Sequence, residues 1–200
     1  MLRNERGRSM TGFEYFFGFF GLLLGLTVAE VASKLANAID SHAERPIGLL
    51  TSMLAAFVIL DIASFWIWTW PMREIIDVTW GTVLLALIVA LSYFLSASLI
   101  FPRTPDWPSY DVHYWARKRY VLTGIIFANI FLVGVPLTFR SPQWNDVWLF
   151  VMMGIYWIPL IALWFSRSRR VDLVLLTVLI LQFVLDATNI LPDSQWVNDI

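Results

Sequence analysis

Two aspartates inside long apolar stretches are the side chains of this sequence best placed for chemistry. Asp61 lies in FVILDIAS and Asp186 lies in QFVLDATN, and three residues after each aspartate there is a polar side chain, Ser64 or Asn189. A carboxylate at the centre of a bilayer costs about 2.5–3.5 kcal/mol on insertion scales, so such a group is a candidate functional residue. Two acids close together would bind or relay a proton or a small cation.

The spacing along the chain indicates where these groups would lie in a helical bundle. At 1.5 Å per residue, both aspartates lie about 21–23 Å from the start of their stretches, so we expect them at similar depth. Gln182, Asp186 and Asn189 follow at intervals of four and three residues, which places them on one face of a helix. The alternative is structural, because polar side chains also hydrogen-bond between membrane helices and hold them together. The sequence leaves both roles open for Asp61 and Asp186.

Glu30 is a third acid within an apolar stretch. Lys34 follows four residues later on the same helical face. A Glu–Lys pair at this spacing stabilises a helix, and the lysine can extend to the membrane surface. Glu30 is therefore either half of an ion pair or a third member of an ion site with Asp61 and Asp186.

The first apolar stretch also carries a ridge of small residues. Gly18, Gly21, Gly25 and Ala29 recur every three or four residues, so they share one face of a helix. Small residues let the backbones of membrane helices approach closely. We expect this helix-packing ridge to form a seam inside one molecule or, as the alternative, a contact with a second copy or another membrane protein.

A basic run lies between two later apolar stretches. Arg117, Lys118 and Arg119 could hold anionic lipid headgroups, or they could act only as positive residues that set the orientation of the chain. Asp111 and His113 precede this run. An enzyme acting on lipid headgroups would use them beside Arg117, although no spacing requires it.

The composition excludes several classes of protein. Hydrophobic residues make up 58% of the chain and charged residues only 14%, against about 25% in soluble domains. The net charge of -1 is not that of a nucleic-acid-binding protein. The absence of cysteine excludes disulfides and thiolate ligands, and two histidines leave little for a metal site. Hydrolase, metalloprotease and nucleotide-binding motifs are missing, so we expect no catalytic site, no metal and no cofactor.

Six stretches are long and apolar enough to cross a bilayer, which takes about 20 residues of helix. Prolines at or just beyond their ends suit helix termini, and the alternating pattern of membrane β-strands is absent. We therefore predict an all-α polytopic membrane protein. Its single domain would be a six-helix transmembrane bundle with short loops, whose spans cover residues 12–32, 47–70, 80–101, 120–139, 147–165 and 171–191.

The distribution of positive residues predicts the orientation of this bundle. Five Lys and Arg residues fall on the side of both termini and nine fall on the other side. Positive residues stay in the cytoplasm, so we expect both termini on the outer, periplasmic side. Met10 is an alternative start to Met1, and a chain that begins there has two positive residues in place of five.

Three segments of the chain resemble a group of small bacterial integral membrane proteins of unknown function. These segments are FEYFFGFFGLLLGLTVAE (Phe13 to Glu30), SFWIW (Ser64 to Trp68) and PDWPSYDVHYWARKRY (Pro105 to Tyr120). The resemblance implies a protein of about 200 residues with six spans in the bacterial inner membrane. It implies no activity, cofactor or catalytic residue.

These patterns favour a non-enzymatic accessory or interaction protein of the bacterial inner membrane, whose polar residues mostly serve helix packing. Its partners would be the lipid bilayer and either a second copy of the chain or another membrane protein, with no nucleic acid. The alternative is a small proton- or cation-coupled transporter or channel that uses Asp61, Asp186 and Glu30.

Overall fold

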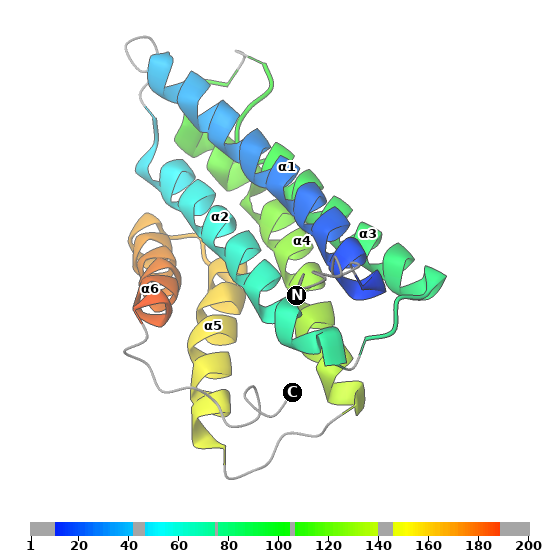
Figure 1. The fold of residues 1–200 in the computed structure, drawn as a ribbon. Helices are drawn as coiled ribbons and strands as arrows, with labels where there is room; N and C mark the ends of the chain where they lie inside the picture. The colour runs from blue at the N-terminus through cyan, green and yellow to red at the C-terminus, as the bar shows by residue number, and fades with distance from the viewer. Residues whose placement is uncertain (1–10, 42–46, 75, 105–106, 140–145, 189–200) are drawn as a thin grey trace, which may run out of the picture.

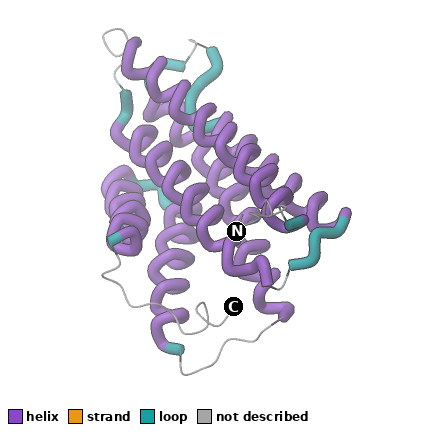
Figure 2. Tube along the Cα trace, viewed as in Figure 1, coloured by secondary structure: helices purple, strands orange, loops and turns teal. Residues whose placement is uncertain are grey.

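The long elements of the structure are all helices, as the sequence predicts. The computed structural model describes residues 11–41, 47–74, 76–104, 107–139 and 146–188, and these residues contain no strand (Figure 2). A short 3-10 helix, η1, extends the second of six α-helices. In chain order the elements are α1 (Gly12–Asp40), α2 (Leu49–Thr69), η1 (Trp70–Glu74), α3 (Trp80–Ser98), α4 (Tyr110–Phe139), α5 (Val147–Phe165) and α6 (Arg169–Ala187). The predicted all-α fold is confirmed.

Successive helices run in opposite directions and form one bundle (Figure 1). In this view α1, α3 and α5 run upward, whereas α2, α4 and α6 run downward. The end at which α1, α3 and α5 finish and α2, α4 and α6 begin is called the upper end of the bundle below, and the opposite end is called the lower end. α2 packs against α1, α4 and α6, and α4 packs against α2, α3 and α5. α2 and α4 therefore lie at the centre, and polar side chains on their inner faces meet protein rather than lipid.

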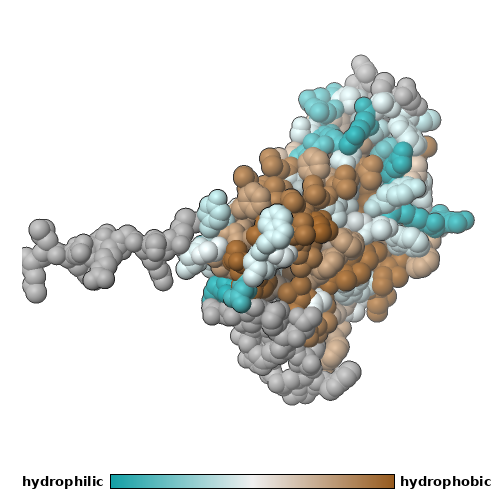
Figure 3. Space-filling model, turned by 90° about the vertical axis from the view of Figure 1, so that its right-hand side faces the viewer, coloured by the Kyte–Doolittle hydropathy of each residue, from teal (hydrophilic) through white to brown (hydrophobic). Residues whose placement is uncertain are grey.

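Five helices are long and apolar enough to cross a membrane: α1, α2 with η1, α3, α4 and α5. α6 carries Arg169, Arg170 and Asp172 in its first turn and Asp186 in its last. The sixth predicted span, residues 171–191, also ends outside the described residues. Many large apolar side chains are exposed, and Figure 3 shows a broad apolar band below a hydrophilic upper end. Such a surface suits contact with lipid rather than water.

The helices differ from the predicted spans where the chain leaves the apolar region. α1 continues past residue 32 to Asp40, and α4 begins at Tyr110 rather than at residue 120. Polar residues such as Lys, Arg and Gln are good helix formers, so a helix need not end with its apolar stretch. The predicted starts of α1, α3 and α5 agree with the structure, because Thr11, Thr79 and Asp146 cap the first backbone N–H groups.

The ridge of small residues on α1 is not a seam inside the bundle. Gly18, Gly25 and Ala29 are exposed, and a methyl group added to either glycine would meet no atom within 4 Å. Gly21 is the exception, because an added Cβ would lie 2.7 Å from Nε1 of Trp66. Large side chains, which gain more from burial, form the inner face of α1. These are Phe13, Phe16, Phe17, Phe20 and Leu24. The prediction that this ridge forms an internal seam is therefore wrong except at Gly21. A contact between the ridge and a second copy stays a prediction.

The close approach between helices occurs instead at Gly124, where α4 crosses α3. An added Cβ at Gly124 would overlap Oγ of Ser96 and would lie 3.0 Å from the backbone oxygen of Ser92. A residue without a side chain is thus required for α3 and α4 to pack at this distance. The contact brings Tyr93 of α3 beside Asn129 of α4, which is the start of the site described next.

Candidate functional site

A buried carboxylate near the middle of α2 joins four helices. Asp61 is 2% exposed, and three side chains from three other helices donate hydrogen bonds to it. Oη of Tyr93 on α3 donates to Oδ2 at 2.8 Å, and Nδ2 of Asn129 on α4 donates to the same oxygen at 3.1 Å. Oη of Tyr156 on α5 donates to Oδ1 at 2.6 Å. These four residues are called the Asp61 network below.

The donors of the Asp61 network are themselves buried and fixed by further contacts. Nδ2 of Asn129 also donates to Oη of Tyr93 at 3.0 Å and to the backbone oxygen of Ile125 at 3.1 Å. The ring of Phe65 packs edge-on against Tyr93, with 5.4 Å between ring centroids. Tyr156 is 9% exposed, and the other two donors are more deeply buried. The network is therefore a rigid group shielded from water.

The Asp61 network balances a carboxylate with neutral donors. Phenol and amide groups donate hydrogen bonds without adding charge, and the ion pairs that the structure describes do not involve Asp61. In a medium of low dielectric constant such bonds are strong, and a donor left without an acceptor is costly. The arrangement can hold four helices together. It can also take up one proton, because a phenol oxygen that now donates can accept instead.

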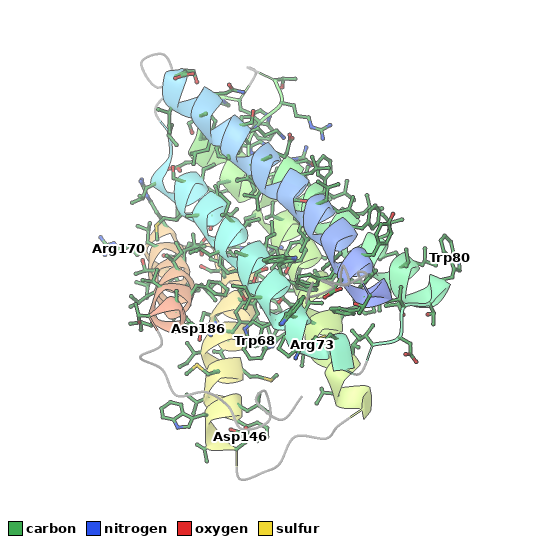
Figure 4. The ribbon with its side chains drawn as sticks, viewed as in Figure 1. Trp68, Arg73, Trp80, Asp146, Arg170 and Asp186 are labelled. Atoms are coloured by element: carbon green, nitrogen blue, oxygen red, sulfur yellow. The ribbon has the colours of Figure 1, made fainter. Side chains whose placement is uncertain are left out.

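Asp186 does not belong to the Asp61 network. Phe57 and Phe183 lie about one turn before the two aspartates, and their ring centroids are 6.2 Å apart, so the aspartates lie at a similar level. The ring of Phe183 also packs against Tyr156 of the network, at 6.2 Å. Asp186, however, lies in the last turn of α6 and is exposed (Figure 4). α6 thus meets the network through an apolar ring, and the predicted pair of acids is not formed.

The other residues of the predicted ion site also lie apart from Asp61. Gln182 is half-buried on α6, and its Oε1 has no hydrogen-bond partner among the described residues. Ser64 is half-buried on α2, and Asn189 lies outside the described residues. Glu30 pairs with Lys34 as the helical spacing predicts, and this pair is described next.

Glu30 is held by an ion pair near the upper end of the bundle. Its Oε1 lies 2.8 Å from Nζ of Lys34, and the same Nζ donates to the backbone oxygen of Ser98 on α3 at 2.9 Å. This pairing explains why an acid is tolerated within an apolar helix, and the explanation does not require an ion site. Among the described residues, no three His, Asp or Glu side chains converge as metal ligands would.

A second buried polar group, which the sequence analysis missed, joins α4 and α6 at the upper end. Nζ of Lys118 lies 2.5 Å from Oδ2 of Asp172 and donates to the backbone oxygen of Ser166 at 2.7 Å. Oη of Tyr114 donates to the same oxygen of Asp172 at 2.8 Å. Lys118 is 2% exposed and Asp172 is completely buried. Tyr114, Lys118 and Asp172 are called the upper polar cluster below.

The three residues of the basic run have different surroundings, because successive residues of a helix point about 100° apart. The burial of Lys118 removes it from the predicted site for lipid headgroups. Arg119 is half-buried, and its Nε donates to the backbone oxygen of Trp164 at 3.2 Å. Arg117 is exposed and lies over the ring of Tyr120. Of the three, Arg117 remains the candidate for contact with an anionic headgroup.

Asp111, His113 and Arg117 differ in their burial and in their partners. Oδ2 of Asp111 lies 3.7 Å from Nη2 of Arg169 on α6. His113 is 4% exposed and packs edge-on against Trp107, with 4.9 Å between ring centroids. Arg117 follows His113 by four residues on the same side of α4, but its side chain is exposed, whereas the ring of His113 is buried. The alternative of an enzyme acting on lipid headgroups stays a prediction.

Two members of the Asp61 network are tyrosines that no pattern in the sequence indicated. Tyr93 and Tyr156 lie well inside apolar stretches, whereas tyrosine in membrane helices is enriched at the interfaces. A buried phenol needs a hydrogen-bond partner. Two tyrosines and Asn129 within apolar spans are therefore the signal that could have indicated a shared acceptor such as Asp61.

Comparisons with known proteins add no assignment. No protein-family model matches the chain, and no match is found among the curated proteins or the solved structures. The resemblance to small bacterial membrane proteins, carried by Phe13–Glu30, Ser64–Trp68 and Pro105–Tyr120, therefore stays a prediction.

Replacing Asp61 by alanine leaves three buried donors without their acceptor. Hydrogen bonds between membrane helices contribute about 0.6–1.7 kcal/mol each, so we expect Asp61→Ala to lower the free energy of unfolding by about 2–5 kcal/mol. The control Asp40→Ala removes an exposed carboxylate at the end of α1 and should change the free energy of unfolding by no more than about 0.5 kcal/mol. Chemical unfolding of the full chain in micelles, followed by circular dichroism, measures both values. Equal losses in the two variants would contradict the structural role of Asp61.

Replacing Lys118 by methionine leaves the carboxylate of Asp172 buried without its cation. Breaking a buried ion pair in this way costs about 3–5 kcal/mol, whereas Arg117→Met on the exposed face should cost no more than about 0.5 kcal/mol. Lys118→Met combined with Asp172→Leu removes both charges and should recover most of the lost stability. The same unfolding measurement applies to all three variants. A double variant as unstable as Lys118→Met would count against this account.

Proposed function

We propose that the chain is a non-enzymatic, multi-pass protein of the bacterial inner membrane that acts as an accessory or interaction protein. The observation that supports this proposal is the Asp61 network. In it, three neutral side chains from α3, α4 and α5 donate hydrogen bonds to a carboxylate that is buried in the bundle. A polar group used in this way holds membrane helices together. A catalytic carboxylate would instead face a cleft that admits substrate.

The packing between the two polar groups supports a role other than transport. Asn129 of the Asp61 network and Lys118 of the upper polar cluster lie about 16 Å apart along α4, at 1.5 Å per residue. Between them, the apolar side chains of Val121, Leu122 and Ile125 are completely buried. A proton or cation crossing the bundle would need polar groups or water over this distance. The buried side chains of α4 place hydrocarbon there instead, and the hydroxyl of Ser96 on α3, which lies against Gly124, donates to the backbone oxygen of Ser92.

Transport coupled to a proton or cation is the second candidate function. The observation in its favour is that the hydrogen-bond donors around Asp61 carry no positive charge. A proton or small cation could therefore balance the carboxylate. Transport would then require α4 to move enough to open the apolar layer around Leu122.

Positive residues support an orientation in which the upper end of the bundle faces the cytoplasm and both termini lie outside. The arginines exposed at this end are Arg103, Arg117, Arg167, Arg169 and Arg170. Figure 4 shows Arg170 pointing away from the bundle, and Arg73 is exposed at the lower end. Positive residues are retained in the cytoplasm. In this orientation, lipid surrounds the apolar band, and a second copy or another membrane protein would pack on the exposed ridge of α1.

A flux assay separates the two candidate functions. The full chain and Asp61→Asn are reconstituted into vesicles that enclose a pH-sensitive dye, and a pH or cation gradient is imposed. We expect no proton or cation flux above that of protein-free vesicles for either protein, because the apolar layer lies between the polar groups. Flux with the full chain that disappears in Asp61→Asn, while this variant still elutes as a folded particle, would establish transport and overturn the proposal.

Reporter fusions test the proposed orientation. Alkaline phosphatase fused after Ile200 should be active, and green fluorescent protein fused at the same position should be dark, because the first needs the periplasm and the second needs the cytoplasm. Fusions after Ser168, in the connection between α5 and α6, should give the opposite results. A fluorescent fusion at Ile200 would contradict the orientation without bearing on the Asp61 network.

A further inference from the structure

A cavity of about 330 Å³ lies at the lower end of the bundle. It is open on one side and is lined by the first half of α1, the end of α2 with η1, the first half of α3 and the last turns of α4. Its inner wall includes Phe20, Phe65 and Val89, all of which are buried. Because the cavity opens at the surface of the bundle, a ligand can enter it without unfolding the helices.

The cavity lies where the apolar core divides into two parts. Phe13, Phe16 and Phe17 at the start of α1 form a buried cluster of their own, separate from the main core that contains Phe20. Ala86 of α3 packs against both parts and also lines the cavity. The rings of Phe16 and Phe20 are nearly parallel, with centroids 6.3 Å apart. Stiff aromatic side chains therefore keep this space open.

The walls of the cavity determine the body of a ligand. Of the sixteen lining residues, four are polar, and the others are apolar or glycine. Water finds few hydrogen-bond partners along such walls, so an apolar group can displace it at little cost. At about 30 Å³ for each water-sized group, the volume holds roughly eleven such groups. That capacity suits one unbranched hydrocarbon chain of roughly ten carbons with a small head.

The polar residues at the mouth determine the head of the ligand. Thr79 and Thr82 are already engaged, because their hydroxyls lie 3.1 Å apart and Oγ1 of Thr82 donates to the backbone oxygen of Asp77 at 2.7 Å. Asp77 is an exposed residue that also lines the cavity. Its carboxylate accepts hydrogen bonds and is negatively charged. It therefore favours a head that donates a hydrogen bond and repels an anionic head.

We infer that this cavity binds one single-chain amphiphile, with its hydrocarbon tail between the aromatic walls and its non-anionic, hydrogen-bond-donating head beside Asp77. A membrane supplies such molecules, because their tails share the hydrocarbon region that surrounds the helices. The inference goes beyond the proposed function and does not rest on it. A protein that transports ions and one that does not could hold the same ligand.

Mass spectrometry of the intact chain tests this binding. The full chain is purified in a fluorocarbon detergent, whose tails mix poorly with hydrocarbon, and is titrated with decan-1-ol. We expect saturation at one decan-1-ol per chain. Decanoate has the same chain length but an anionic head, so it should bind about tenfold more weakly. Unsaturable binding of decan-1-ol, no binding, or equal binding of decanoate would overturn the inference.

Two variants locate the site. Ala86→Phe fills the cavity and should weaken decan-1-ol binding by about tenfold or more, whereas Ala56→Phe, at an exposed position of α2, should leave it unchanged. Asp77→Lys alters only an exposed side chain and should reverse the preference, so that decanoate binds more tightly than decan-1-ol. If Ala86→Phe does not fold, Asp77→Lys still decides the question. An unchanged preference in Asp77→Lys would overturn the inference.

Discussion

A carboxylate that is removed from water must have its oxygens hydrogen-bonded, and this requirement at Asp61 governs how α2, α3, α4 and α5 pack. The three donors lie on three different helices, so each hydrogen bond positions one helix relative to α2. Apolar contacts tolerate sliding, whereas a hydrogen bond weakens steeply with distance and angle. The Asp61 network therefore sets the rotation and the register of four helices at once.

α4 extends this hydrogen-bonded frame to α6, whereas α1 is attached in another way. Asn129 connects α4 to α2 and α3, and Lys118, three turns earlier, connects it to α6. α1 packs largely through aromatic rings, such as Phe17 on Trp66, with Lys34 as a polar link to α3. Ring contacts are less demanding than hydrogen bonds, and the cavity lies at the end of the bundle that they hold together.

The helices could be predicted from the sequence because apolar length, caps and spacing within one helix are local properties. The start of α3 at Trp80, after its cap Thr79, and the pair of Glu30 with Lys34 are examples. The partners of Asp61 could not be predicted in this way. FVILDIAS and QFVLDATN indicate a similar depth for both aspartates. Whether neighbouring helices bury an aspartate at that depth depends on how the helices cross, which the sequence of one helix does not show. Asp61 is buried because α2 lies at the centre of the bundle, whereas Asp186 is exposed in the last turn of α6.

The cavity and the Asp61 network share a wall, and this gives the structural role of Asp61 a consequence for binding. Phe65 lines the cavity on one side and packs against Tyr93 of the network on the other. A hydrocarbon chain in the cavity would fill the space beside Phe65 and so oppose movement of Tyr93 away from Asp61. By the same linkage, loosening the network would enlarge the cavity and weaken binding. A rigid network that shapes an adjacent apolar site is thus compatible with an accessory protein that holds a membrane ligand.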